Sequence, residues 1–406
     1  MFDFLIIGGG ISGFYCALEL IKRNKNISIC EKYLDLGGRA ITYNQDGYTW
    51  EIGAGRISEK HSLVLNLMKK YKQPLVSIGG NVLYKNGECL EENIFESNID
   101  AMFGPLKKLD KEVLANNTIK ELCYKIHGKE KTDEYLIRFP YKAEVEVLRA
   151  DLGLESFSHE MGSHEGYFVA KNGLSNLIQA MKDDFLSKGG IIFTNYECIN
   201  VTVEENISCE FLVGKRSIKK RKHTILQTNK LICAMESENL KKISFFKNLE
   251  VLKKIKMEPL LRTYGAFEKP WFSQLPRIVT NSPIRYFLPM NYEKGVAMVS
   301  YTDSKDTEIF HKVLVKHGEE SLGKFIYNQL TILFGSLPKM IYFKAHYWKY
   351  GASYWLPGNY SPLEESKKSL NPFPNIYLVG ESYSLKQAWM EGALEQAEKL
   401  FNTYRL

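Results

Sequence analysis

Residues 2–31 read "FDFLIIGGGISGFYCALELIKRNKNISICE". An apolar run with strand character enters a glycine-rich turn, and apolar residues at helical spacing follow the turn. A second strand-like run then ends at Glu31. Gly8, Gly10 and Gly13 form a G-x-G-x-x-G pattern between the first strand and the helix. This order of elements predicts a Rossmann-like α/β unit that binds a dinucleotide.

The glycine turn has a specific chemistry. Gly8 permits the turn, Gly10 lets the backbone approach a pyrophosphate, and Gly13 lets the helix pack closely on the strand. Ser12 stands at the start of the helix, where the helix dipole attracts an anion. The Glu31 carboxylate would accept hydrogen bonds from a ribose diol, which favours FAD or NAD over NADP.

Further strand and helix patterns lie far along the chain. "GGRAIT" (37–42) follows the second strand, and Arg39 in it can pair with pyrophosphate charge or stand as a surface cation. Residues 168–193, 229–235 and 375–401 again alternate between strand and helix character. The separated pieces predict a discontinuous nucleotide-binding domain with other material inserted between them.

Composition is typical of a globular protein of 406 residues, with 44% hydrophobic and 25% charged residues and a net charge of +7. The seven cysteines have no metal-ligand spacing, so we expect reduced thiols and no metal. No apolar run approaches the roughly 18 residues that span a bilayer. We therefore expect a cytoplasmic protein that binds neither membrane nor nucleic acid, with the basic run 214–223 as a solvated hairpin tip. The oligomeric state is left open, a homodimer included.

Motifs at both ends of the chain resemble one family. "GGGISG" with "GGRAIT", and "YLVGESYSLKQAWMEGALEQAEKL" (377–400), are similar to the two FAD signatures of the flavin-containing amine oxidase family. That family includes monoamine, polyamine and L-amino-acid oxidases. The resemblance implies a discontinuous FAD-binding domain of residues 1–75, 165–240 and 365–406. It also implies an inserted α+β substrate domain of residues 76–164 and 241–364.

The resemblance also implies the contacts with FAD. Glu381 would lie near the ribityl-pyrophosphate part, Met390 near the isoalloxazine ring, and the backbone of Cys198 near the adenine. Ser353 stands where monoamine oxidases carry a cysteine bonded to flavin, so FAD is expected to be non-covalent. The implied FAD contacts are Gly8, Gly10, Ser12, Gly13, Glu31, Lys32, Gly38, Arg39, Gly53, Ala54, Gly55, Arg56, Cys198, Gly380, Glu381, Trp389, Met390 and Ala393.

The stretch "IGAGRISEKH" (52–61) resembles the loop of L-amino-acid oxidases in which an arginine grips the substrate carboxylate. Arg56 would take that role, because its planar fork can bind both carboxylate oxygens. Tyr301 in "GVAMVSYTDSKD" (295–306) would share the carboxylate. The alternatives are that Arg56 contacts a flavin phosphate or a structural carboxylate, and that Tyr301 is a half-buried strand aromatic.

Three further positions bear on catalysis. Tyr354 and Trp389 would frame the substrate amine as two flat walls. Arg262 stands where most family members hold a lysine near flavin N5, and arginine cannot give up its proton. Ala388 replaces a glycine usual in the family, and its methyl group is expected to crowd the substrate.

We therefore expect an FAD-dependent enzyme that oxidises the α-amino group of an L-amino acid. Hydride passes to flavin N5, and O2 is the expected acceptor, giving a keto acid, ammonia and hydrogen peroxide. Three alternatives stay open: a polyamine or monoamine oxidase, a desaturase or porphyrinogen-type oxidase, and a flavin-bearing binding protein without turnover.

Overall fold

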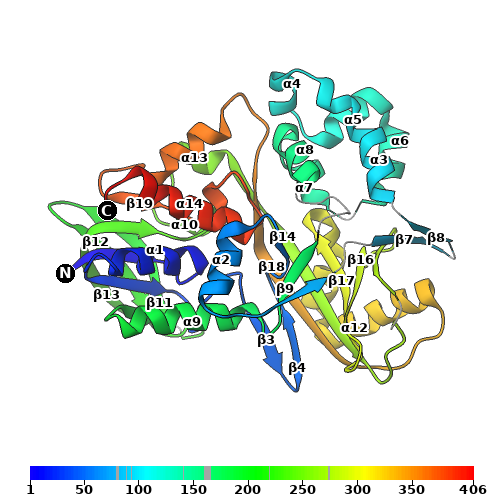
Figure 1. Cartoon of the computed structure of the whole chain (residues 1–406), viewed down its shortest axis with the longest axis horizontal. Helices are drawn as coiled ribbons and strands as arrows, with labels where there is room; N and C mark the ends of the chain where they lie inside the picture. Colours follow the sequence, from blue (N-terminus) through cyan, green and yellow to red (C-terminus); the bar gives the residue numbers. More distant parts are fainter. Residues whose placement is uncertain are drawn as a thin grey trace. The chain divides into compact units, whose positions relative to one another are not determined.

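The computed structural model describes residues 1–78, 82–87, 89–92, 94–139, 141–159, 166–218, 220–272 and 275–406 (Figure 1). The chain forms two compact units, and both are discontinuous in sequence. The first unit comprises Met1–Ile78, Tyr167–Met257 and Tyr360–Leu406, and the second comprises Gly79–Gly166 and Glu258–Asn359. The domain boundary predicted at residues 164–165 lies outside the described residues.

The first unit is built on a seven-stranded sheet in the order β10-β2-β1-β13-β12-β11, with β19 paired to β13. Ile6 in the first strand pairs with Ile29 on one side and Ile232 on the other. The apolar segments that pair here, residues 4–7, 27–30 and 231–233, are buried, as expected in a parallel sheet. The parallel strands are β1 (Phe2–Ile7), β2 (Ile27–Glu31), β10 (Ile191–Thr194), β13 (Lys222–Cys233) and β19 (Ile376–Leu378). The antiparallel strands are β11 (Tyr196–Val203) and β12 (Ile207–Val213).

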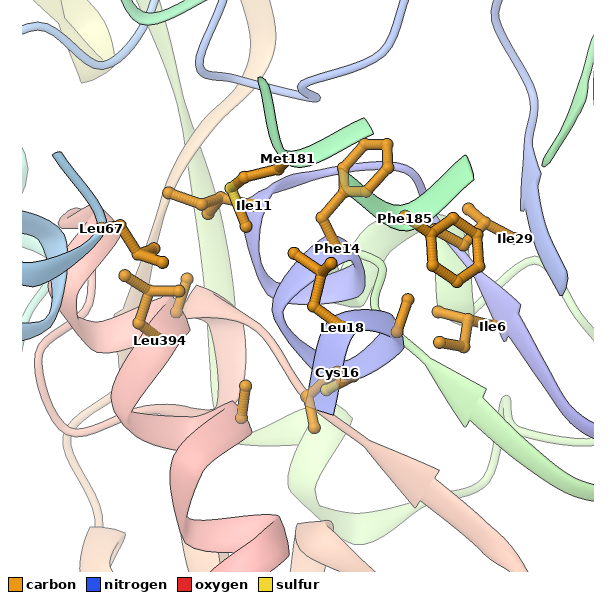
Figure 2. Packing of buried hydrophobic residues seen from close by; sticks show 14 of the residues in the cluster. Ile6, Ile11, Phe14, Cys16, Leu18, Ile29, Leu67, Met181, Phe185 and Leu394 are labelled. Carbon is orange, nitrogen blue, oxygen red and sulfur yellow. The ribbon is translucent and has the colours of Figure 1, made fainter. Parts of the chain in front are cut away.

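Four helices supply the core of this unit. They are α1 (Ile11–Ile21), α2 (Ser62–Lys70), α9 (Leu174–Ser187) and α14 (Met390–Thr403). Figure 2 shows Phe14 of α1, Phe185 of α9 and Leu394 of α14 in the same cluster as Ile6 of β1. All of these side chains are fully buried. The cluster therefore ties together three segments that are far apart in the chain.

Two small sheets and several short helices complete the first unit. Glu51 at the end of β4 accepts a hydrogen bond from the Leu174 amide at 2.7 Å, which satisfies a backbone donor at the start of α9. The hairpin consists of β3 (Thr42–Gln45) and β4 (Tyr48–Glu51), and the three-stranded sheet consists of β5 (Ile57–Ser58), β9 (Tyr167–Ala170) and β6 (Leu75–Ile78). The short helices are α10 (Ser237–Leu240), α11 (Glu250–Lys253), α13 (Pro362–Leu370) and η3 (Glu381–Tyr383).

The second unit contains a seven-stranded sheet in the order β18-β14-β17-β16-β15-β7-β8. The helix α12 (Thr307–Phe334), which is interrupted at Gly318, shares a buried core with this sheet that includes Leu261, Val299 and Ile326. The strands are β7 (Val82–Asn86), β8 (Cys89–Glu92), β14 (Ile255–Phe267), β15 (Arg277–Thr280), β16 (Tyr286–Asn291), β17 (Val296–Asp303) and β18 (Met340–Trp355).

A helical subregion of the second unit has a core of its own, centred on Phe103, Phe139 and Phe157. Its helices are α3 (Ile94–Phe103), η1 (Pro105–Lys108), α4 (Lys111–Ala115), α5 (Ile119–His127), α6 (Lys129–Ile137), α7 (Lys142–Glu146) and α8 (Ala150–His159). The short helix η2 (Ser304–Asp306) follows β17.

The basic run 214–223 lies at the hairpin between β12 and β13. Arg221 and Arg216 of this run lie 2.6 and 3.7 Å from the Glu197 carboxylate, whereas Lys219 lies outside the described residues. Within the described ranges, no helix has both the length and the apolar character needed to cross a membrane.

The start of α2 is held by the first turn of α14. The Glu391 carboxylate accepts hydrogen bonds from the Leu63 and Val64 amides, both at 2.9 Å. We expect Glu391→Gln to lower the free energy of unfolding by about 1–2 kcal/mol, because an amide cannot accept on both of its terminal atoms. Urea unfolding measures this change. The exposed Glu59→Gln is the matched control, and equal stabilities of the two variants would contradict the capping role.

Candidate functional site

The glycine turn after β1 is shaped by close backbone contact. A Cβ atom at Gly13 would lie 2.0 Å from the Gly8 carbonyl oxygen, which no side chain tolerates. Gly8 has φ +113°, and a Cβ atom there would lie 2.3 Å from the Ala234 carbonyl oxygen. Both glycines are therefore required by the packing of α1 and β13 against the turn.

Gly10 differs from Gly8 and Gly13, because the packing of the protein does not require a glycine at this position. Its backbone is extended, and a Cβ atom would meet no protein atom nearer than the Gly37 carbonyl oxygen at 3.9 Å. In the part of the chain that is described, no side chain caps the amides of the first turn of α1. Open space beside uncapped amides fits a pyrophosphate, which would approach Gly10 and accept from those amides.

The acidic end of β2 lies next to this turn. The Glu31 carboxylate accepts hydrogen bonds from the Gly9 amide at 2.8 Å and the Tyr33 amide at 3.0 Å. Burial raises the pKa of Glu31, and these two bonds oppose that rise. Each carboxylate oxygen keeps a second lone pair, which can accept from a ribose hydroxyl. The neighbouring Lys32 has its amine 5.0 Å from the centre of the Tyr33 ring.

Two loops from distant parts of the chain meet near the turn. The Gly37 amide donates to the Gly9 carbonyl at 2.8 Å, which brings Gly38 and Arg39 alongside. Arg39 then forms a 2.9 Å ion pair with Glu381 from the C-terminal segment. Gly380 lies beside Ser12, since a Cβ atom there would be 3.7 Å from the serine hydroxyl.

Glu381 also fixes the backbone before α14. It accepts a hydrogen bond from the Ala388 amide at 2.7 Å. Ala388 has φ +67°, a left-handed conformation that costs a residue with a side chain about 1–2 kcal/mol. The Ala388 side chain is exposed. This conformation explains why a glycine would be favoured at the position.

The loop of residues 52–61 places Arg56 against two aromatic rings. The Ala54 amide donates to the Arg39 carbonyl at 2.8 Å, which fixes the base of the loop. The Arg56 guanidinium carbon lies 5.2 Å from the Tyr167 ring centre and 5.8 Å from that of Trp389. The two rings are nearly parallel, with centres 6.5 Å apart. Tyr167, which our sequence analysis missed, thus joins the candidate site.

His61 closes the same loop and was also missed. Its ring centre lies 4.8 Å from that of Trp389, at an interplanar angle of 67°. Among the other predicted residues of this unit, Gly53 is buried and Gly55 is partly buried. Met390 and Ala393 lie in the hydrophobic core, and Cys198 is buried on β11.

The second unit brings three predicted residues into one region. Arg262 of β14 pairs in register with Tyr301 of β17, and its guanidinium carbon lies 5.5 Å from the tyrosine ring centre. The Arg262 Nε is buried, and no described residue accepts a hydrogen bond from it. The Tyr354 hydroxyl donates to the Glu144 carboxylate at 3.2 Å, and the adjacent Ser353 is fully buried.

A second buried carboxyl, Asp303, belongs to the same region. Its Oδ1 accepts from the Lys142 amide at 3.0 Å, and its Oδ2 has no hydrogen-bond partner among the residues described. Burial, and then the charge of Glu144, raises the pKa of Asp303 well above its usual value. Burial likewise raises the pKa of Tyr301, whose neighbouring charges include Asp303, Glu144 and Arg262. Sequence reasoning missed both carboxyls, since Glu144 lies in a charged helix that shows no sign of burial and Asp303 is the polar last residue of β17.

Solved structures of putrescine oxidase resemble the whole chain. The wild-type enzyme bound to putrescine matches with a TM-score of 0.77 and 14% sequence identity, covering 99% of this chain and 98% of that chain. A single-residue mutant of it matches with a TM-score of 0.78 and the same identity, covering 99% of both chains. This likeness confirms the predicted Rossmann-like two-domain α/β fold class.

Curated relatives match over a short segment. The chloroplastic prolycopene isomerase of Arabidopsis thaliana is 37% identical over 54 residues, which is 13% of this chain and 9% of that protein. The enzyme of Daucus carota is 36% identical over 53 residues, with the same coverage. The chain thus spans less than a tenth of the length of the curated relatives that it matches.

The family comparison extends over nearly the whole sequence. The family described as flavin containing amine oxidoreductase matches residues 11–399. This match confirms the predicted family, and the predicted FAD cofactor and enzyme class agree with it. The glycine turn, the uncapped start of α1 and Glu31 are the features of this structure that fit the cofactor. The chain belongs to the flavin-containing amine oxidoreductase family.

Proposed function

We propose that this oxidoreductase acts on the α-amino group of an L-amino acid. The setting of Arg56 supports the proposal, because its guanidinium lies over the rings of both Tyr167 and Trp389. Aromatic faces orient a guanidinium plane, and the N–H donors in that plane match the two oxygens of a carboxylate. A plain amine offers no group of opposite charge to such a cation.

The proposal assigns FAD to the first unit. The start of α1 and Gly10 would meet the pyrophosphate, Glu31 the ribose diol, and Arg39, held by Glu381, would add positive charge. When bound, FAD supplies the hydride acceptor, N5 of its isoalloxazine ring. All of the predicted FAD contacts stay predictions, and the others are Gly8, Ser12, Gly13, Lys32, Gly38, Gly53, Ala54, Gly55, Arg56, Cys198, Gly380, Trp389, Met390 and Ala393.

The chain's own residues would bind and desolvate the substrate. Arg56 would hold the carboxylate, with Tyr301 as the predicted second contact. Tyr354 and Trp389 would keep water from the amine, and desolvation favours the uncharged amine, the form that can release a hydride. Arg262 would order water as a permanent cation. In the balanced reaction, amino acid, O2 and water give keto acid, ammonia and hydrogen peroxide.

A plain amine or diamine is the second candidate substrate. Buried carboxyls favour it, because Glu144 bonds to Tyr354, and Asp303 lies close enough for the Glu144 charge to raise its pKa. A buried carboxylate attracts an ammonium group. Burial and the Glu144 charge raise the pKa of Asp303, however, which disfavours a second negative charge in this region.

Substrate class decides between the two candidates. We expect L-amino acids, and not the amines obtained by removing their carboxyl group, to bleach the FAD-loaded protein when mixed without oxygen. In Arg56→Lys, we expect kcat/KM for amino acids to fall roughly 10- to 100-fold, because a point charge replaces a bidentate fork. Absorbance of the flavin measures both results.

Arg23→Lys is the matched control. Arg23 is exposed, and its guanidinium donates to the Leu406 carbonyl rather than lying over the Tyr167 and Trp389 rings. Bleaching by amines alone would overturn the amino-acid proposal in favour of the second candidate. Unchanged selectivity in Arg56→Lys would remove Arg56 from the substrate role.

Gly10→Ala tests the pyrophosphate position. The added methyl group would meet only the Gly37 carbonyl oxygen, at an ordinary contact distance of 3.9 Å, so we expect the FAD-free protein to keep its stability. We expect FAD affinity to fall at least about tenfold, because the methyl group takes the space assigned to the ligand. Gly13→Ala is the contrasting variant, and it should destabilise the FAD-free protein. Wild-type FAD affinity in Gly10→Ala would exclude this position from the cofactor site.

Ser353 supports non-covalent binding of FAD. Its hydroxyl cannot form the thioether that a cysteine forms with flavin, and the side chain is fully buried. We expect heat denaturation to release all of the flavin into the supernatant, where absorbance measures it. Flavin that stays with the precipitated chain after denaturation would contradict this expectation.

A further inference from the structure

The Arg56 loop ends in a turn that two reciprocal hydrogen bonds close. The Ser58 amide donates to Nδ1 of His61 at 3.1 Å, and the His61 amide donates to the Ser58 carbonyl at 3.0 Å. Ser58 is fully buried, and His61 is 1% exposed. The imidazole is therefore part of the turn rather than a side chain free to rotate.

The first of these bonds decides where the imidazole carries its proton. A neutral imidazole has one N–H and one acceptor nitrogen. Since Nδ1 accepts the Ser58 amide, the proton must lie on Nε2. This Nε2 is buried, and no nitrogen or oxygen of the described residues is bonded to it.

The Trp389 ring is the neighbour that can meet this N–H. The two ring centres are 4.8 Å apart, and the planes are inclined by 67°, so one ring presents its edge to the other. An N–H that points at an aromatic face forms a weak hydrogen bond. We propose that His61 is a positioning residue whose Nε2–H donates to the face of Trp389 and sets the plane of that ring.

The surrounding charges keep His61 neutral. The pKa of His61 is lowered to about 4, mainly by burial and then by the positive charges of Lys386 and Arg56. Lys386 itself is paired with Glu395 at 2.7 Å. A protonated imidazole would carry a hydrogen on Nδ1 as well, and the Ser58 bond would be lost. The turn and the orientation of Trp389 thus depend on the same uncharged tautomer.

This arrangement links the two parts of the proposed substrate site. Arg56 lies two residues before the turn, and Trp389 contacts both Arg56 and the imidazole that ends the turn. His61 therefore holds the carboxylate-binding cation and the aromatic wall in one fixed relation. Its effect on turnover rests on the proposed function, whereas its tautomer and its effect on Trp389 do not.

The tautomer can be measured directly on the full chain. Long-range ¹H–¹⁵N NMR spectra of histidine-labelled protein distinguish the two ring nitrogens, and His61→Asn assigns the signals. We expect an unprotonated Nδ1 and a protonated Nε2 at pH 6, with and without FAD. A proton on Nδ1, alone or on both nitrogens, would overturn the proposal.

Two substitutions separate the two functions of the ring. The side-chain amide of an asparagine would occupy the position of the imidazole Nδ1, and that of a glutamine would reach the position of Nε2. We expect His61→Asn to keep the turn and to shift and broaden the ¹⁹F signal of Trp389 in protein labelled with 5-fluorotryptophan. His61→Gln should keep that signal closer to wild type. Trp389→Phe assigns the signal among the five tryptophans.

His346→Asn is the matched control, because His346 also lies edge-on to an aromatic ring, that of Tyr264, but belongs to the second unit. We expect it to leave the Trp389 signal unchanged. An unchanged Trp389 signal in His61→Asn would overturn the proposal. For an amino acid that bleaches the flavin, His61→Asn should reduce kcat/KM at least tenfold, mainly through KM. If no amino acid bleaches it, the proposed function fails and the NMR result still decides the role of His61.

Discussion

The close approach of α1 to the turn after β1 is the constraint on which the candidate site depends. No Cβ atom fits at Gly13, 2.0 Å from the Gly8 carbonyl, so the helix can begin directly over the carboxyl end of the strand. That position opens the first amides of α1 toward the space beside Gly10. It also leaves room for the Gly37 loop, which bonds to Gly9, and for Gly380, which lies beside Ser12. The features that we assign to FAD binding thus share one backbone contact.

The two units carry different charges near their predicted substrate residues. In the first unit, Arg56 and Lys386 are cations, and burial keeps His61 neutral. In the second unit, the Glu144 carboxylate accepts a hydrogen bond from Tyr354, and the Arg262 guanidinium lies over the Tyr301 ring. An amino acid carries both signs of charge, whereas a plain amine carries one. An amino acid would therefore offer the cations of the first unit a carboxylate to bind, whereas a plain amine would not.

Much of the fold could be predicted because its signals are local. The glycine turn, the carboxylate that ends the second strand and the C-terminal motif are each readable within a few residues. Tyr167, His61 and Glu144 could not be found in this way. Tyr167 is one of two adjacent aromatics on a four-residue strand, and His61 precedes a helix with a polar face. Glu144 lies in a short helix with Lys142 and Glu146 beside it, and only tertiary packing buries it. The left-handed conformation of Ala388 likewise depends on Glu381, which lies seven residues earlier.

The interleaving of the two units has a consequence for the order in which the chain can fold during synthesis. Strand β1 is made some 220 residues before its neighbour β13, and β19, which pairs with β13, follows only near residue 376. The second unit also waits for a distant segment, since β7 pairs with β15. Pairings between such distant segments form slowly, because a long loop must close before the contact stabilises it. Neither unit can complete its sheet until its last strand, β19 or β18, has left the ribosome, so the apolar strand β1 must be shielded from association until then.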